Sequence, residues 1–145
     1  MTGPPRGARV RSILVPVDGS ASSRRAVELA VEMATALDAS LRLLHVAPVS
    51  DLPALIGESE SPRGTEEGQV ILAEAARLAK RRGVEPAIEL RRGRASGQIL
   101  RSAEAHRPDL IVMGTRGLTG ARSVLMGSVS RAVSRGAKTQ VVLVR

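Results

Sequence analysis

The sequence contains no cysteine, no aromatic residue and only two histidines, His45 and His106. Without cysteine there can be no disulfide, no thiolate metal site and no cysteine nucleophile, and two histidines argue against a histidine-built zinc site. Without Phe, Tyr or Trp the chain cannot build the stacking surfaces that single-stranded nucleic-acid binders use. We therefore predict a domain with an aliphatic core and no side-chain metal site.

Long apolar runs are also missing. No segment approaches the roughly 18 consecutive apolar residues of a membrane-spanning helix, and residues 1–11 hold prolines, glycines and arginines but no signal-peptide core. We expect no contact with a membrane and a cytoplasmic location. The chain of 145 residues fits one domain, which we place at residues 12–145 behind a flexible basic arm at residues 1–11.

Positive charge is in excess, with 22 basic and 14 acidic residues and a formal net charge of +8. Nearly all of the basic residues are arginines, because Lys80 and Lys138 are the only lysines. This balance favours an anionic partner, whether nucleic acid, an anionic surface or a phosphorylated small molecule. The plainer interpretation is that most arginines cover solvated faces.

Short runs of branched apolar residues alternate with stretches whose apolar residues recur every three or four positions, which predicts buried strands and amphipathic helices. The predicted strands cover residues 12–18, 40–46, 84–90, 109–114 and 140–144, and the predicted helices cover residues 21–37, 65–81, 96–106 and 128–135. This order predicts an α/β protein, an open, doubly wound parallel sheet of five strands with helices on both faces. The segment from Asp51 to Gly64 is predicted to be a long loop, and the sequence does not indicate whether it acts as a lid.

The loops after the first and fourth strands are the predicted binding region, because ligands of such sheets bind beyond the carboxyl ends of the strands. After the fourth strand the sequence reads Gly114-Thr115-Arg116-Gly117, then nine residues, then Gly127-Ser128-Val129-Ser130. Glycine allows close backbone approach and positive φ, and a helix start offers free N–H groups to an anion. We expect the N–H groups of Gly127 and Ser128, the hydroxyls of Ser128 and Ser130 and the Arg116 guanidinium to hold phosphate.

This glycine pattern resembles that of the nucleotide-binding branch of the universal stress protein family. The resemblance extends to Pro16-Val17-Asp18-Gly19-Ser20, to Leu44-His45-Val46 and to the segment from Asp109 to Gly114, and it covers nearly the whole chain after residue 11. It implies a Rossmann-like fold, similar to the adenine nucleotide alpha hydrolases, with strand order 3-2-1-4-5. It further implies ATP, with Mg²⁺, between strands one and four, and a homodimer formed through the last strand, Val141 to Val144.

Residue roles follow from the resemblance one position at a time. Pro16 and Val46 would border the adenine, Asp18 would bond the nucleoside or a metal-bound water, and Met113 and Gly114 would line the ribose. The glycine-rich loop and the helix after it would surround the phosphates. The implied contacts are Pro16, Val17, Asp18, Val46, Met113, Gly114, Arg116, Gly117, Gly127, Ser128, Val129 and Ser130.

Plainer interpretations exist for several of these residues. Asp18 could simply cap the helix that follows it. His45 is expected to be a satisfied core histidine, and His106 to mark a helix end. Ser128 has no histidine or lysine placed to activate it as a nucleophile, so we predict phosphate binding and no catalytic residue.

Three functions remain open on the sequence. The first is an ATP-binding stress-response homodimer that works by nucleotide-dependent conformation. The second is a slow ATP-hydrolysing or nucleotidyl-transferring enzyme, although efficient hydrolysis is not predicted, because only Arg116, Arg122 and backbone donors are available around a γ-phosphate. The third is an interaction protein that binds no nucleotide ligand and contacts nucleic acid through its arginines, as the net charge of +8 allows. The lack of aromatics disfavours nucleic acid as its partner.

Overall fold

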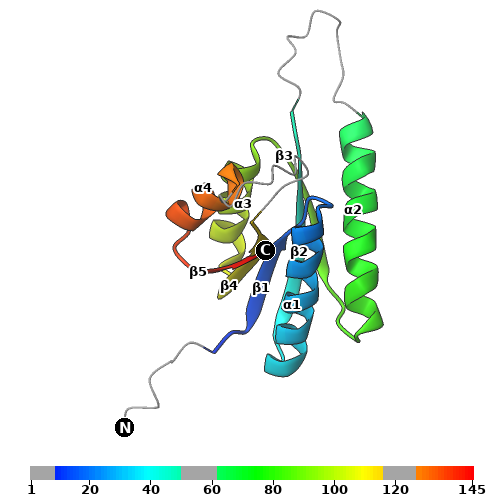
Figure 1. Cartoon of the computed structure of the whole chain (residues 1–145), viewed down its shortest axis with the longest axis vertical. Coiled ribbons are helices and arrows are strands. Elements are labelled where there is room, and N and C mark those ends of the chain that lie inside the picture. Colours follow the sequence, from blue (N-terminus) through cyan, green and yellow to red (C-terminus); the bar gives the residue numbers. More distant parts are fainter. Residues whose placement is uncertain (1–8, 50–61, 116–126) are drawn as a thin grey trace, which may run out of the picture.

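The computed structural model describes residues 9–49, 62–115 and 127–145. Its strands form one parallel sheet in the order β3-β2-β1-β4-β5 (Figure 1). The strands are β1 (Ser12–Pro16), β2 (Ser40–Ala47), β3 (Ala87–Arg92), β4 (Leu110–Gly114) and β5 (Gln140–Val144). The predicted fold class and strand order are confirmed.

Helices cover both faces of this sheet (Figure 1). They are α1 (Ala21–Leu37), α2 (Pro62–Arg81), α3 (Ala95–His106) and α4 (Ser128–Gly136). Successive residues of a strand point to opposite faces, so Ile13 and Val15 of β1 pack under α1 and α2, whereas Leu14 packs under α3 and α4. The central strands β1 and β4 are buried on both faces and are almost entirely apolar, whereas the edge strand β3 carries charged residues and is only partly buried.

Three predicted elements have an end that is wrong by two residues or more, and in the first of them β1 ends at Pro16 rather than at residue 18. The second helix begins at Pro62 rather than at Thr65, because a proline in the first turn gives up only an N–H group that has no helical acceptor. The third strand covers Ala87–Arg92 rather than residues 84–90. Gly83 has a φ of +80°, and the Val84 N–H donates to Ala79 O at 3.0 Å, so these residues end α2 before the strand can start.

The chain is held against the sheet from Arg11 onward. The Arg11 N–H donates to Asp109 Oδ2 at 2.9 Å, and the Ser40 N–H donates to Arg11 O at 2.8 Å. Residues 1–8 of the predicted arm lie outside the described residues, as do residues 51–61 of the predicted loop. Among the helices that the structure describes, none is both long enough and apolar enough to cross a membrane.

Candidate functional site

A cavity of about 200 Å³ lies at the carboxyl ends of β1 and β4, and we call it the cleft. It is lined by every predicted site residue that the structure describes. These residues are Pro16, Val17, Asp18, Val46, Met113, Gly114, Gly127, Ser128, Val129 and Ser130. The remaining predicted residues, Arg116 and Gly117, lie outside the described residues. Sequence positions more than a hundred residues apart therefore share one wall, as the parallel sheet requires.

The cleft also contains residues that the sequence did not single out as ligand contacts. Ser20, Ser23, Leu44, His45 and Thr115 sit beside predicted positions, so their proximity in the chain could have indicated them. Ala95 and Ile99 come from the start of α3. No local motif marks these two, because only the packing of α3 on the sheet brings them to the cleft.

Asp18 is fixed by the turn between β1 and α1, and it is not the cap of the helix. Its Oδ1 accepts the Ser20 N–H at 2.8 Å, while Ser20 is the N-cap residue, whose hydroxyl oxygen accepts the Ser23 N–H at 3.2 Å. The Asp18 N–H donates to Ser23 Oγ at 3.1 Å. Within the described part of the chain Asp18 Oδ2 accepts no hydrogen bond, so one carboxylate oxygen is left for a ligand.

His45 is a packed core residue, as predicted. The residue is 8% exposed, and Nδ1 lies 2.7 Å from the carbonyl oxygen of Val17. A carbonyl only accepts, so Nδ1 carries the proton and donates it to this bond. The ring also fills the space in front of Gly68, where an added Cβ would lie 2.6 Å from His45 Cδ2. His45 therefore fixes the end of β1 immediately before Asp18.

Gly114 allows the end of β4 to approach the first turn of α1. A Cβ at this position would lie 2.4 Å from Ser22 Oγ and 2.7 Å from both Ser22 C and Ser23 N. Two of these atoms belong to the backbone and cannot move aside. The glycine is thus needed for packing, and the cleft wall depends on that close approach.

The start of α4 differs from the prediction in three respects. Gly127 has a φ of −61°, so it needs no positive φ. Its N–H already donates to Thr115 O at 2.7 Å, and the Ser130 hydroxyl donates to Gly127 O at 3.0 Å. The predicted free amide of Gly127 and free hydroxyl of Ser130 are therefore engaged. What Gly127 provides is space, because an added Cβ would lie 3.1 Å from Thr115 O.

Three main-chain amides remain at this helix start. The first bond of the helical ladder runs from the Arg131 N–H to Gly127 O at 3.1 Å, so the N–H groups of Ser128, Val129 and Ser130 have no acceptor within α4. They point along the positive end of the helix dipole, where an anion is stabilised. The cleft combines these amides with the apolar surfaces of Pro16 and Val46. It can hold a flat apolar group and an anionic group together.

A cluster of charged side chains lies away from the cleft, around Glu89 of β3. The Glu89 carboxylate accepts hydrogen bonds from Arg91 Nε and, at 2.7 Å, from Ser102 Oγ, and it lies 3.4 Å from His106 Nε2 and 3.7 Å from Arg42. Burial by itself would raise the pKa of Glu89. The bonds from Arg91 and Ser102 and the charges of Arg91 and His106 outweigh it, so the pKa is lowered. His106 ends α3, as predicted.

Known proteins are similar to this chain in sequence and in fold. The family model described as "Universal stress protein family" matches residues 9–145. A universal stress protein of Methanocaldococcus jannaschii is 34% identical over 139 aligned residues, and the match covers 93% of this chain and 82% of that protein. The solved universal stress protein UspA of Lactobacillus plantarum is 28% identical with a TM-score of 0.77, covering 94% of this chain and 99% of that one.

A further solved structure is of a universal stress protein in complex with cAMP. It is 29% identical to this chain with a TM-score of 0.71, and the alignment covers 94% of this chain and 98% of that one.

Proposed function

Because the chain belongs to the universal stress protein family, we propose that it binds an adenine nucleotide, ATP together with Mg²⁺, in the cleft. In this proposal the protein is a cytoplasmic homodimer that regulates a stress response through its nucleotide-dependent conformation. The observation that carries the proposal is the meeting of the three amides of Ser128, Val129 and Ser130 with the predicted adenine-side residues in one cavity. The cAMP complex of a family member supports an adenine nucleotide as the ligand class.

The proposed contacts divide by chemistry. Pro16 and Val46 hold the adenine by apolar contact, and Met113 and Gly114 lie along the ribose. The amides of α4 receive the phosphates. Arg116 and Gly117 lie outside the described residues, and they are proposed as phosphate contacts from the family resemblance. Val17 can contribute only main-chain atoms, because its side chain packs on the opposite face of the sheet.

Asp18 fits a role near Mg²⁺. Mg²⁺ keeps most of its water shell and takes one or two carboxylates together with phosphate oxygens. Asp18 supplies one carboxylate oxygen without a protein partner in the described chain, and it lines the same cavity as the α4 amides. When bound, Mg²⁺ would neutralise phosphate charge there, and Asp18 would orient one of its waters.

The proposed dimer forms through β5. This strand is at one end of the sheet, and Val141, Val142, Leu143 and Val144 are each only half-buried in the isolated chain. An apolar edge strand leaves ladder groups unpaired, and pairing with a second copy across a two-fold axis satisfies both edges at once. Sedimentation equilibrium should give twice the chain mass, and a monomer at micromolar concentration would contradict this part of the proposal.

A slow ATPase is the second candidate, and the described part of the cleft favours binding over hydrolysis. A hydrolytic site needs a group that positions or deprotonates water beside the γ-phosphate. His45 lines the cleft, but its Nδ1 donates to Val17 O and its acceptor nitrogen, Nε2, faces Gly68 of α2, where an added Cβ would lie 3.3 Å from it. Asp18 has one carboxylate oxygen left for a ligand, and in this proposal that oxygen orients a water of Mg²⁺ rather than an attacking water. We therefore assign nucleotide binding as the principal activity.

The absence of aromatic residues makes the test unusually direct. The pure protein has no Trp or Tyr to absorb at 280 nm, so a co-purified nucleotide would dominate its near-ultraviolet spectrum. We expect denaturation to release an adenine nucleotide that chromatography and mass spectrometry identify. We also expect calorimetry of the stripped protein to detect binding of ATP with Mg²⁺. If no nucleotide is released and ATP, AMP and cAMP all give no heat, the chain is an interaction protein that binds no nucleotide.

A further inference from the structure

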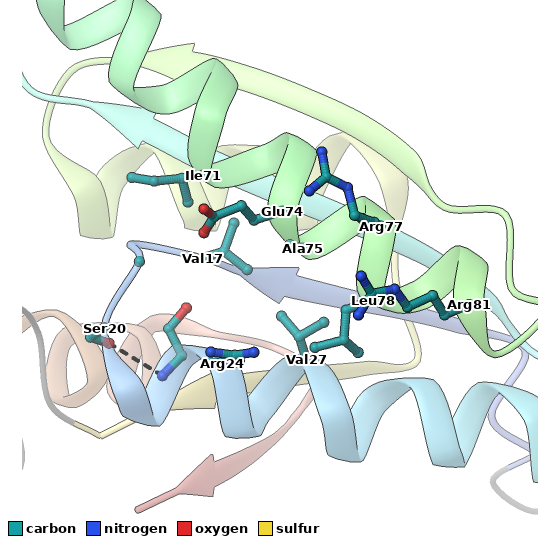
Figure 2. A pocket seen from close by; sticks show the side chains of 12 residues that line it. Val17, Ser20, Arg24, Val27, Ile71, Glu74, Ala75, Arg77, Leu78 and Arg81 are labelled. Carbon is teal, nitrogen blue, oxygen red and sulfur yellow. Dashed lines mark hydrogen bonds between the residues drawn. The ribbon is translucent and has the colours of Figure 1, made fainter.

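A second cavity, of about 310 Å³, lies between α1 and α2 on the sheet face opposite α3 and α4, and we call it the groove. Its apolar surface comes from Val17, Val27, Ile71, Ala75 and Leu78. Figure 2 shows these side chains between the two helices, with Val17 at the level of the sheet. The volume is within the range of cavities that hold small organic molecules.

Charged side chains border this apolar surface. Arg24 rises from α1, and Glu74, Arg77 and Arg81 rise from α2 (Figure 2). Arg24 and Glu74 lie across the groove from each other at the end near Ser20, so this end carries charges of both signs (Figure 2). Arg77 and Arg81 stand further along α2. The groove therefore has an end of mixed charge and a positive end.

The two arginines at the positive end lack acidic partners. They are four residues apart on one helix, an arrangement in which like charges repel. Three neighbouring acids are paired with other cations: Glu28 with Arg24 at 4.0 Å, Glu32 with Arg82 at 3.8 Å and Glu85 with Lys80 at 3.6 Å. The fourth, Glu74, lines the groove three residues before Arg77 and forms no ion pair with either arginine in the described chain. Within the described ranges neither Arg77 nor Arg81 forms an ion pair. An anion placed between them would remove the repulsion and gain charge-assisted hydrogen bonds.

We propose that the groove binds a small amphipathic anion, a molecule with an apolar body and one carboxylate or phosphate group. The apolar body lies along Val27, Ile71 and Leu78, and the anionic group lies at Arg77 and Arg81. The size of the cavity favours a small molecule over a peptide or a nucleic acid. This site is separate from the nucleotide cleft and does not depend on nucleotide binding, although Val17, Ser20 and Ser23 line both cavities.

Titration calorimetry with octanoate, octyl phosphate and 1-octanol tests the proposal on the wild-type protein. We expect both anions to bind with a dissociation constant of about 1 mM or below, and octanol to bind about tenfold more weakly because it lacks the charge. The comparison of octanoate with octyl phosphate distinguishes a carboxylate from a phosphate ligand. No binding of either anion up to about 10 mM would overturn the proposal.

Paired variants then locate the site. The double substitution Arg77→Gln and Arg81→Gln should weaken octanoate binding about tenfold. The control, Arg101→Gln with Arg135→Gln, removes the same charge from exposed arginines that line neither cavity, and it should leave affinity unchanged. Equal weakening in both double variants would mean that only net charge attracts the anion, which contradicts a built site.

A competition experiment separates this site from the cleft. Octanoate affinity should be the same with and without saturating ATP, and displacement of octanoate by ATP would place it in the cleft and overturn the proposal. If ATP does not bind at all, the proposed nucleotide function fails, while the arginine variants still test whether octanoate binds in the groove. A variant that fills the groove, Ala75→Met, should abolish octanoate binding and keep the circular dichroism spectrum. Retained octanoate affinity in this variant would contradict the proposed location.

Discussion

The cleft and the groove lie on opposite sides of the same β1–α1 turn, yet they offer an anion different kinds of hydrogen-bond donor. In the cleft the donors at the start of α4 are main-chain amides, held in place by glycines and by the path of the backbone. In the groove the donors are the guanidinium groups of Arg77 and Arg81 on an apolar surface. A backbone site is therefore sensitive to added volume, whereas a side-chain site is sensitive to lost charge.

The largest expected effect follows from adding volume to the cleft. Gly127→Val places a branched side chain where even a Cβ would lie 3.1 Å from Thr115 O, so the start of α4 must shift and its amides lose their positions. We expect calorimetry to show ATP affinity about a hundredfold lower, equal to a loss of about 2.7 kcal/mol. Octanoate binding in the groove should be unchanged.

The control for this change is Gly97→Val on α3. A Cβ at Gly97 meets nothing within 4 Å, so this variant should keep its ATP affinity. Wild-type affinity in the Gly127 variant would mean that the amides of α4 do not hold the phosphates, and the contrast between the two cavities would then disappear.

Gly114→Ala should mainly lower stability, because it affects the contact between β4 and α1 that underlies both cavities. The added methyl would meet backbone atoms of Ser22 and Ser23 at 2.7 Å. Overpacking of this kind costs about 1–3 kcal/mol, which urea unfolding followed by circular dichroism can measure. Gly97→Ala is the matched control and should be neutral or stabilising. Unchanged stability in the Gly114 variant would show that β4 can move away from α1 at no cost.

Glu89→Gln should change how stability depends on pH, in a region remote from both cavities. The folded pKa of Glu89 is lowered, so its stabilising contribution is present above its ordinary value of 4.5 and is lost as the pH falls through the folded pKa. We expect the variant to be about 1–2 kcal/mol less stable at neutral pH. The difference from wild type should shrink in acid.

Urea unfolding at neutral and acidic pH measures this difference. Glu104→Gln, at an exposed position of α3 with no ion pair in the described chain, is the control and should unfold like wild type at both pH values. A Glu89 variant whose deficit is the same in acid as at neutral pH would contradict the ionic origin of the stabilisation. ATP and octanoate affinities should not change, because Glu89 lines neither cavity.

The smallest expected effect comes from Ser20→Ala, in the turn that the cleft and the groove share. Loss of the Ser20 cap of α1 should lower stability by about 1 kcal/mol. Because Ser20 lines both cavities, both affinities should fall by a similar small factor. Ser134→Ala, at an exposed position of α4, is the control for thermal unfolding. A loss confined to one ligand would show that the turn serves only that cavity.

The parallel sheet and the binding region at its carboxyl edge were predictable from periodicity and from the rule for ligands of parallel sheets. The strand order and most of the individual contact residues came from the family resemblance. The donors at α4 were predicted less well, since the engagement of the Gly127 amide depends on Thr115 O reaching it across the loop. The packing role of Gly114 depends on how closely α1 approaches β4. Neither distance is encoded in local sequence.

The groove was not predicted at all, and the reason is physical. Arg77 and Arg81 lie on the helix predicted at residues 65–81, and they resemble the many solvated arginines of a basic chain. Only the packing of α2 beside α1 places them at the border of an apolar cavity. Glu89 was missed similarly, because its partners come from β2, β3 and α3.

The most direct test of the account is a titration of ¹⁵N-labelled protein with ATP and Mg²⁺, followed by amide NMR. The account predicts that the largest shifts occur at the amides of Ser128, Val129 and Ser130, while the amide of Gly127, already bonded to Thr115, shifts less. The chemical shifts of the α2 amides beside Arg77 and Arg81 should not change until octanoate is added. Large ATP-induced shifts along α2 with none at the start of α4 would contradict the central claim.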